Sequence, residues 1–95
     1  MIHIVGLGPG APDNLTLGAY RELTGAGRTV RLRTGRHPVA EYLCQQGVEF
    51  DTYDHFYQQG EDFARVYSGI AEDVVALAAS GKQVVFAVPG NPWVA

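Results

Sequence analysis

Two loops rich in glycine and proline are the parts of this 95-residue sequence best suited to chemistry. The first, Gly6-Leu7-Gly8-Pro9-Gly10-Ala11-Pro12, follows the apolar run from Met1 to Val5. The second, Pro89-Gly90-Asn91-Pro92, follows the continuously apolar run from Val84 to Val88. In open α/β proteins, loops at the carboxyl ends of parallel strands are the usual ligand contacts. We therefore expect chemistry based on shaped main chain at these two loops.

The first loop formally matches the dinucleotide-binding pattern G-x-G-x-x-G/A, but its details disfavour a nicotinamide or flavin cofactor. Pro9 and Pro12 lack the N–H groups that would face a pyrophosphate, and the next helix is expected to begin only near Asp13. The acidic residue expected after the second strand is missing, since Leu32-Arg33-Thr34 stands there. A phosphate-binding P-loop is excluded because no G-x-x-x-x-G-K-[ST] occurs.

Metal ligands and nucleophiles are poorly supported by the sequence. The candidates are His3 in a strand, His37 before a proline, His55 beside Asp54, and Cys44 in a helix. None has a second ligand at metal spacing, so no metal site is expected. Asp54 and His55 could form an acid–base pair, but adjacent side chains rarely point the same way, so His55 more simply packs or caps. Thr34 could equally be a helix cap or a ligand hydroxyl.

Composition indicates a globular protein, with 46% apolar and 18% charged residues. A net charge of −3 argues against nucleic-acid binding. The single cysteine fits a reducing compartment, and no leader or membrane-spanning run is seen, which predicts a cytoplasmic protein. Five of the seven basic residues fall between Arg21 and Arg36. They could attract an anionic ligand or simply be solvated strand and loop positions.

Strands and helices are expected to alternate along the chain. Four strands are predicted at residues 1–5, 28–33, 48–52 and 84–88. Three helices are predicted between them, capped by Asp13 or Asn14 and ended by Gly25 and Gly27, from Pro38 to Gly47, and from Phe63 to Gly81. Residues 53–60 are expected to form a loop. This order predicts one domain over residues 1–95, an open parallel sheet with helices on both faces in three layers. Alternation in residues 48–52 predicts an edge strand.

The loops resemble those of a known family. The run from Val5 to Leu17 closely resembles the opening motif of the tetrapyrrole (corrin/porphyrin) methylases. Leu32-Arg33-Thr34 with His37-Pro38 resembles a subgroup fused to a MazG nucleotide pyrophosphohydrolase. Val88-Pro89-Gly90-Asn91-Pro92 resembles the Gly-Asp-Pro turn of the family, with Asn91 in place of the aspartate.

The resemblance implies the N-terminal part of an S-adenosylmethionine-dependent methyltransferase, whose active site lies between two domains. Carried over by position, the cofactor-binding residues are Pro89, Gly90, Asn91 and Pro92. Gly8, Pro9, Gly10 and Thr34 would face the methyl acceptor, a small molecule. The family has a fifth strand beside the first and a second domain, and the sequence ends before both. The 95 residues are therefore expected to be inactive alone and, with an unprotected edge at residues 2–5, to form an edge-paired or domain-swapped homodimer.

The sequence also leaves two other functions open: a nucleotide-binding module without catalysis, and a self-associating structural half-domain.

Overall fold

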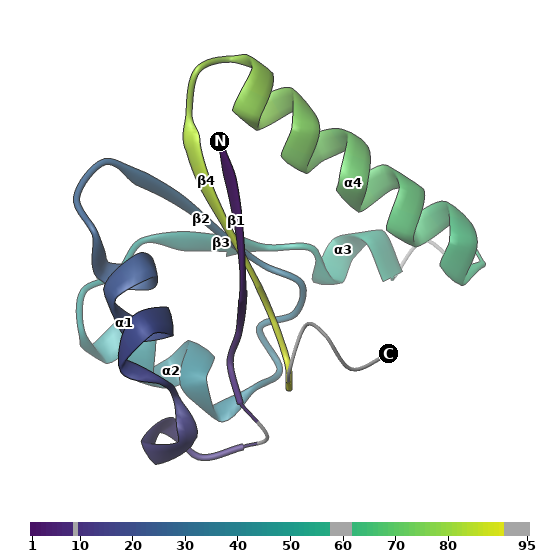
Figure 1. Ribbon diagram of the computed structural model, residues 1–95. Coiled ribbons are helices and arrows are strands. Elements are labelled where there is room, and N and C mark those ends of the chain that lie inside the picture. The colour runs from purple at the N-terminus through teal and green to yellow at the C-terminus, as the bar shows by residue number, and fades with distance from the viewer. Residues whose placement is uncertain (9, 58–61, 91–95) are drawn as a thin grey trace.

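Four parallel strands form one open sheet in the computed structural model, which describes residues 1–8, 10–57 and 62–90 (Figure 1). The strands are β1 (Ile2–Gly6), β2 (Arg28–Leu32), β3 (Phe50–Thr52) and β4 (Gln83–Val88). Their spatial order is β1-β4-β2-β3, and each neighbouring pair is parallel. The predicted parallel α/β sheet is confirmed, and β3 lies at an edge as its alternating sequence indicated.

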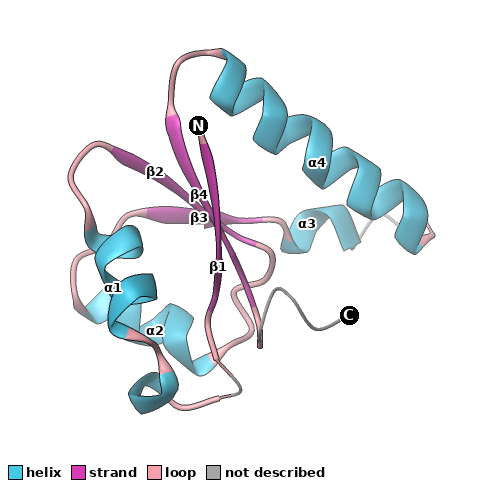
Figure 2. Cartoon of the chain, in the orientation of Figure 1, coloured by secondary structure: helices cyan, strands magenta, loops and turns pink. Residues whose placement is uncertain are grey.

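Helices cover both faces of the sheet (Figure 2). The helices α1 (Leu17–Thr24) and α2 (Pro38–Gln45) lie on one face, and α3 (Asp54–Tyr57) and α4 (Phe63–Ala79) lie on the other. The central strand β4 supplies both cores, because successive side chains of a strand point to opposite faces. Val85 and Ala87 pack toward α1 and α2, whereas Val84 packs toward α4. The predicted three-layer arrangement is confirmed.

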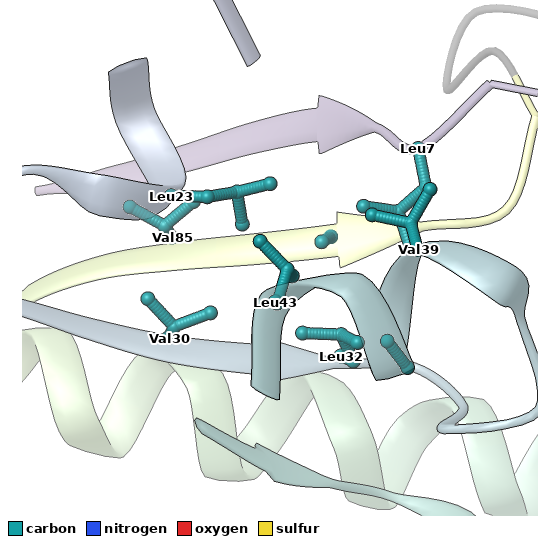
Figure 3. Close-up of a cluster of buried hydrophobic side chains, with 9 residues drawn as sticks. Leu7, Leu23, Val30, Leu32, Val39, Leu43 and Val85 are labelled. Atoms are coloured by element: carbon teal, nitrogen blue, oxygen red, sulfur yellow. The ribbon is translucent and has the colours of Figure 1, made fainter. Parts of the chain in front are cut away.

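The core beneath α1 and α2 is entirely apolar. Figure 3 shows Leu23 of α1 and Leu43 of α2 directed at the strands that carry Val85 and Val30. Near the carboxyl ends of the strands, Leu7 lies against Val39. This packing anchors the first residue after β1 and the first turn of α2 to the same core. The loops above it are therefore held on a rigid base.

The first helix begins later than the sequence suggested. Residues Pro12–Asn14 form a separate turn of 3-10 helix, and α1 starts after Thr16, whose hydroxyl accepts a hydrogen bond from the Ala19 N–H at 3.0 Å. The prediction that Asp13 or Asn14 caps α1 is wrong, because extended backbone at Leu15 separates the two segments. Gly25 follows α1 with a φ of −64°, and it is Gly27, at +74°, that adopts the left-handed conformation.

The segment after β3 is not all loop. Residues 54–57 form the short helix α3, where residues 53–60 were predicted to be irregular. Phe56 packs against Gly69 of α4, where an added Cβ would come within 3.2 Å of the ring. Because Gly69 has no side chain, the Phe56 ring fits against α4. This packing holds residues 54–57 in a helical turn. Residues 58–60 lie outside the described part of the chain.

The longest helix, α4, begins at a capping Asp62, whose carboxylate accepts the Arg65 N–H at 2.9 Å. Its buried stripe is Val66, Ile70 and Val74. Phe63 and Tyr67 lie on another side of the helix and are exposed. No helix in the described ranges is long and apolar enough to cross a membrane.

Candidate functional site at the carboxyl edge of the sheet

The loops that follow β1 and β4 are joined to each other by their main chains. The Gly8 N–H donates to the Gly90 carbonyl at 3.3 Å, and the Gly90 N–H donates back to the Gly8 carbonyl at 3.0 Å. This reciprocal pair is an antiparallel bridge that follows directly on the parallel pairing of β1 and β4. The two glycine-rich motifs of the sequence, more than eighty positions apart, are thus one structural unit.

Gly8 is a position that only glycine can fill without strain. Its φ is +80°, in the left-handed region that disfavours side chains. A Cβ at Gly8 would also lie 2.8 Å from the main-chain carbonyl oxygen of Asn14. The opening loop therefore packs its backbone against the turn formed by residues 12–14.

His37 connects the loop after β2 to this bridge. Its Nε2 lies 3.0 Å from the Gly8 carbonyl oxygen, and its Nδ1 lies 3.1 Å from the Val39 nitrogen. Because the Val39 N–H must donate to Nδ1, the proton of the neutral ring belongs on Nε2, which donates to Gly8. The imidazole both caps α2 and holds the Gly8 carbonyl, which accepts from His37 and Gly90 together.

The loop after β2 is also fastened to the start of α3. The Thr34 hydroxyl donates to Asp54 Oδ1 at 2.6 Å, and the Gly35 N–H donates to Oδ2 at 2.8 Å. Thr34 accepts in turn from the Arg36 N–H at 3.1 Å. Partial burial raises the pKa of Asp54, but hydrogen bonds from Thr34, Gly35 and Thr52 and the charge of Arg36 together outweigh it and hold that pKa below its usual value.

These contacts distinguish between the alternative roles that the sequence left open for Thr34 and for His55. Thr34 does not cap α2, since His37 does, and its hydroxyl is engaged with Asp54. Asp54 and His55 have separate partners, because the His55 ring packs edge-on against Phe56 with ring centroids 4.6 Å apart. His55 therefore packs against a neighbouring ring, which is one of the two simpler roles, packing or capping, that the sequence indicated for it. Within the described residues, no group of three His, Cys, Asp or Glu side chains could hold a metal ion.

The predicted site residues that are described lie on this one edge. Pro89 and Gly90 follow β4, Gly8 and Gly10 follow β1, and Thr34 follows β2. Pro9, Asn91 and Pro92 lie outside the described residues. At Gly10 and Gly90 an added Cβ would meet no atom of the described residues within 4 Å, so that part of the structure leaves room for a ligand beside the main chain.

Sequence reasoning overlooked His37 and Asp54 as organisers of this edge. For His37, the available signal was its place immediately before a proline at the start of a helix, which is a capping position. For Asp54 the signal was its place directly after β3, at the same edge as the other loops. Both residues position loops and neither has a reactive partner.

The carboxyl edge does not have the geometry of a dinucleotide site. α1 begins at Leu17, well beyond the loop of residues 6–11, and its capping position is occupied by Thr16. The helix N-terminus that would face a pyrophosphate is therefore not part of the glycine-rich loop. The fold and site define an open parallel α/β protein that presents shaped, hydrogen-bonded loops at the carboxyl ends of its strands.

Comparison with known proteins identifies the family. Residues 1–95 match the model of the Tetrapyrrole (Corrin/Porphyrin) Methylases, and the chain belongs to this family. It is 42% identical over 94 residues to the uncharacterized protein YabN of Bacillus subtilis (strain 168), an alignment that covers 99% of this chain and 19% of YabN. It is also similar to the crystal structure of uroporphyrin-III-C-methyltransferase from Thermus thermophilus, with a TM-score of 0.67 and 26% identity, over 98% of this chain and 36% of that one. The chain thus spans about a fifth and about a third of these two relatives.

Proposed function

We propose that this chain forms the N-terminal part of an S-adenosylmethionine-dependent methyltransferase and contributes one wall of its active site. The observation that carries the proposal is the bridge between Gly8 and Gly90. It brings the opening motif of the family and its closing turn together at one edge of the sheet. Methyl transfer depends on orienting two reactants and excluding water, for which rigid main-chain loops are well suited.

The residues at this edge suit a cofactor that approaches the main chain. The open space at Gly90 supports contact between the cofactor and the turn formed by Pro89, Gly90, Asn91 and Pro92. Gly8, Pro9, Gly10 and Thr34 are proposed to face the methyl acceptor. When bound, S-adenosylmethionine supplies an electrophilic methyl group on its sulfonium. The chain's own residues would bind and orient, with His37 and Asp54 fixing the loops.

We further propose that the parent protein belongs to the subgroup linked to a MazG nucleotide pyrophosphohydrolase. The support is the pair His37-Pro38 after Leu32-Arg33-Thr34, which the structure ties to the opening loop through the His37–Gly8 hydrogen bond. The four fifths of YabN outside the alignment leave ample length for further domains. Since the chain spans 36% of the solved methyltransferase, we expect no turnover from these 95 residues alone.

Calorimetric titration of the 95-residue chain with S-adenosylhomocysteine, NADH and ATP tests the proposal. We expect S-adenosylhomocysteine alone to bind, with amide chemical-shift changes concentrated at Gly8, Gly10 and Gly90. Gly90→Ala should weaken this binding at least fivefold, because the added methyl group enters the open space beside the turn.

Gly27→Ala is the matched control. Gly27 has a similar φ of +74° and open surroundings, but it directly precedes β2 and so lies at the amino-terminal ends of the strands, away from the candidate site. It should leave the affinity unchanged. Preferential binding of NADH or ATP would replace the methyltransferase proposal with a nucleotide-binding module.

A further inference from the structure

The sheet face that carries α3 and α4 has polar side chains on β2 and β3. Val30 and Leu32 of β2 belong to the core beneath α1 and α2, and successive side chains of a strand point to opposite faces. Arg31 therefore lies on the face of α3 and α4 (Figure 2), beside Asp51, its partner in the register of β2 and β3. The longest helix, α4, packs chiefly on β4 and β1. It leaves Arg31 and Asp51 beside the helix.

A polar pocket lies between α4 and the β3 edge of the sheet. Its volume is about 460 Å³, within the range of about 300–1,000 Å³ that is typical of small-molecule sites. Its lining includes three charged side chains and three with rings: Arg31, Asp51, Asp73, Tyr53, His55 and Phe56. Because β3 and β1 stand at opposite ends of the strand order, the fifth strand expected beside β1 would not cover this pocket.

Tyr53 holds one carboxylate of the pocket in place. Its ring is buried and packs edge-on against Phe56 and Phe86, with ring centroids 5.2 and 6.0 Å apart. Its hydroxyl donates to Oδ2 of Asp73 on α4 at 2.6 Å. Burial and this carboxylate raise the pKa of Tyr53, and the nearby Arg31 guanidinium opposes them, so the phenol stays a hydrogen-bond donor. The Asp73 carboxylate is therefore fixed at the wall of the pocket.

Arg31 has more hydrogen-bond donors than the described residues use. Its side chain is only 21% exposed, and a guanidinium carries five N–H donors. Within the described part of the chain, its one hydrogen bond of good geometry runs from Nη1 to the Val30 carbonyl at 3.2 Å. The same nitrogen lies 3.8 Å from Oδ2 of Asp51, which is too long for a hydrogen bond. Most of the guanidinium is thus available to a ligand in the pocket.

The charges of the pocket favour a ligand that is itself both positive and negative. A simple anion attracted by Arg31 is repelled by the carboxylates of Asp51 and Asp73. A simple cation is attracted by those carboxylates but leaves the Arg31 donors unused. A zwitterion can place each of its charges beside the opposite charge of the protein, so that the attractions add. A carboxylate also matches the fork of N–H groups on a guanidinium.

We propose that this pocket binds an α-amino acid with an apolar side chain. The ligand carboxylate lies on the Arg31 guanidinium, and its ammonium group faces the carboxylates of Asp51 and Asp73. Its side chain lies against the rings of His55 and Phe56, which pack edge-on with centroids 4.6 Å apart. The pocket is on the α4 face of the sheet and uses none of the residues proposed to bind the cofactor or the methyl acceptor.

Amide chemical-shift titration of the 95-residue chain with L-phenylalanine, 3-phenylpropanoate and 2-phenylethylamine tests the proposal. The second compound lacks the ammonium group and the third lacks the carboxylate. We expect L-phenylalanine to shift the amides of residues 31, 51–56 and 73 and to bind about tenfold or more tightly than either analogue. Equal affinities for the three compounds, or no shifts with L-phenylalanine, would overturn the proposal. Shifts concentrated at Gly8 and Gly90 would also overturn it, because they would place the amino acid at the carboxyl edge.

Arg31→Gln should weaken L-phenylalanine binding about tenfold or more. Asp51→Asn, at a side chain that is 78% exposed, should weaken it about threefold without affecting the fold, which circular dichroism checks for each variant. Arg28→Gln is the matched control, because Arg28 is on the same strand but lies 3.6 Å from Glu22 of α1, on the other face. Equal losses in Arg31→Gln and Arg28→Gln would contradict the assignment. Binding of S-adenosylhomocysteine at Gly8 and Gly90 is a separate readout, so either proposal can fail without the other.

Discussion

Replacing Gly8 by alanine should destabilise the fold more than the same change at other glycines with positive φ. A left-handed backbone costs a non-glycine residue about 1–2 kcal/mol. At Gly8 the new Cβ would also lie 2.8 Å from the Asn14 carbonyl oxygen, which belongs to main chain and cannot rotate away. Relief requires the loop to shift, weakening the hydrogen bonds to Gly90 and His37, each worth about 0.5–1.5 kcal/mol. We expect a total loss of about 2–4 kcal/mol.

Gly90→Ala and Gly27→Ala isolate the backbone contribution. Both positions have positive φ, +71° and +74°, and at neither would an added Cβ lie within 4 Å of an atom of the described residues. Each should therefore cost only about 1–2 kcal/mol. The difference between Gly8→Ala and the two controls measures the contact with Asn14.

Urea unfolding followed by circular dichroism at 222 nm provides the measurement, with equal slopes expected for all variants. Thermal midpoints should fall by about 4–8 °C per kcal/mol in a domain of this size. An osmolyte such as TMAO can be added equally to all samples if Gly8→Ala is too unstable in buffer. Equal unfolding free energies for Gly8→Ala and Gly90→Ala would refute the reasoning, because the clash would then have no energetic effect.

Three further variants test the other contacts at this end of the sheet. Asp54→Asn should lose about 1–3 kcal/mol near neutral pH. The pKa of Asp54 is lowered in the folded state, so the extra stability of the wild type over Asp54→Asn should be complete above the unfolded pKa of about 3.9. It should vanish as the pH falls through the folded-state pKa. Urea unfolding midpoints measured from pH 7 to 2.5 would show this loss. Tyr53→Phe removes a buried hydroxyl that donates to Asp73 at 2.6 Å, which should lower the free energy of unfolding by about 1–2 kcal/mol while thermal unfolding stays cooperative. An unchanged free energy of unfolding would mean that the hydroxyl is hydrogen-bonded to water instead. His37→Asn keeps a cap for α2 but is too short to reach Gly8, so hydrogen exchange at the Gly90 amide should accelerate while α2 amides stay protected; unchanged exchange would contradict the link.

The sheet could be predicted from the sequence because its strands have strong and different patterns. Residues 84–88 are continuously apolar, and β4 is buried on both faces, with Val84, Val85 and Ala87 fully enclosed. The glycines at 47 and 81 follow α2 and α4 with positive φ, as expected after helices. These are local rules, and nothing in the tertiary structure opposes them.

The misassigned parts depend on contacts between distant residues. The helical turn α3 forms where Phe56 fits against Gly69, thirteen positions later, which no local pattern reveals. Asp13 and Asn14 are good capping residues, but their turn is held by Gly8, whose backbone approaches the Asn14 carbonyl. Thr16 then becomes the cap of α1.

The candidate site was located from the sequence only at the level of loops. Glycine and proline marked the segments after β1 and β4, and parallel topology placed them at one edge. That Gly8 and Gly90 hydrogen-bond directly depends on β1 and β4 being neighbours, which the order of elements along the chain does not specify. The roles of His37 and Asp54 follow from that same adjacency.

The pairing of β1 with β4 also sets the timing of folding during synthesis. Of the four described strands, β1 is made first and β4 last, and among them β1 has no neighbour other than β4. Closing the chain between Gly6 and Gln83 costs on the order of 4 kcal/mol in entropy, before any contact of β1 compensates for it. On the ribosome, β1 must therefore wait until residue 88 has emerged. Of the four described strands, β1 is therefore the one that a nascent chain leaves unpaired for longest.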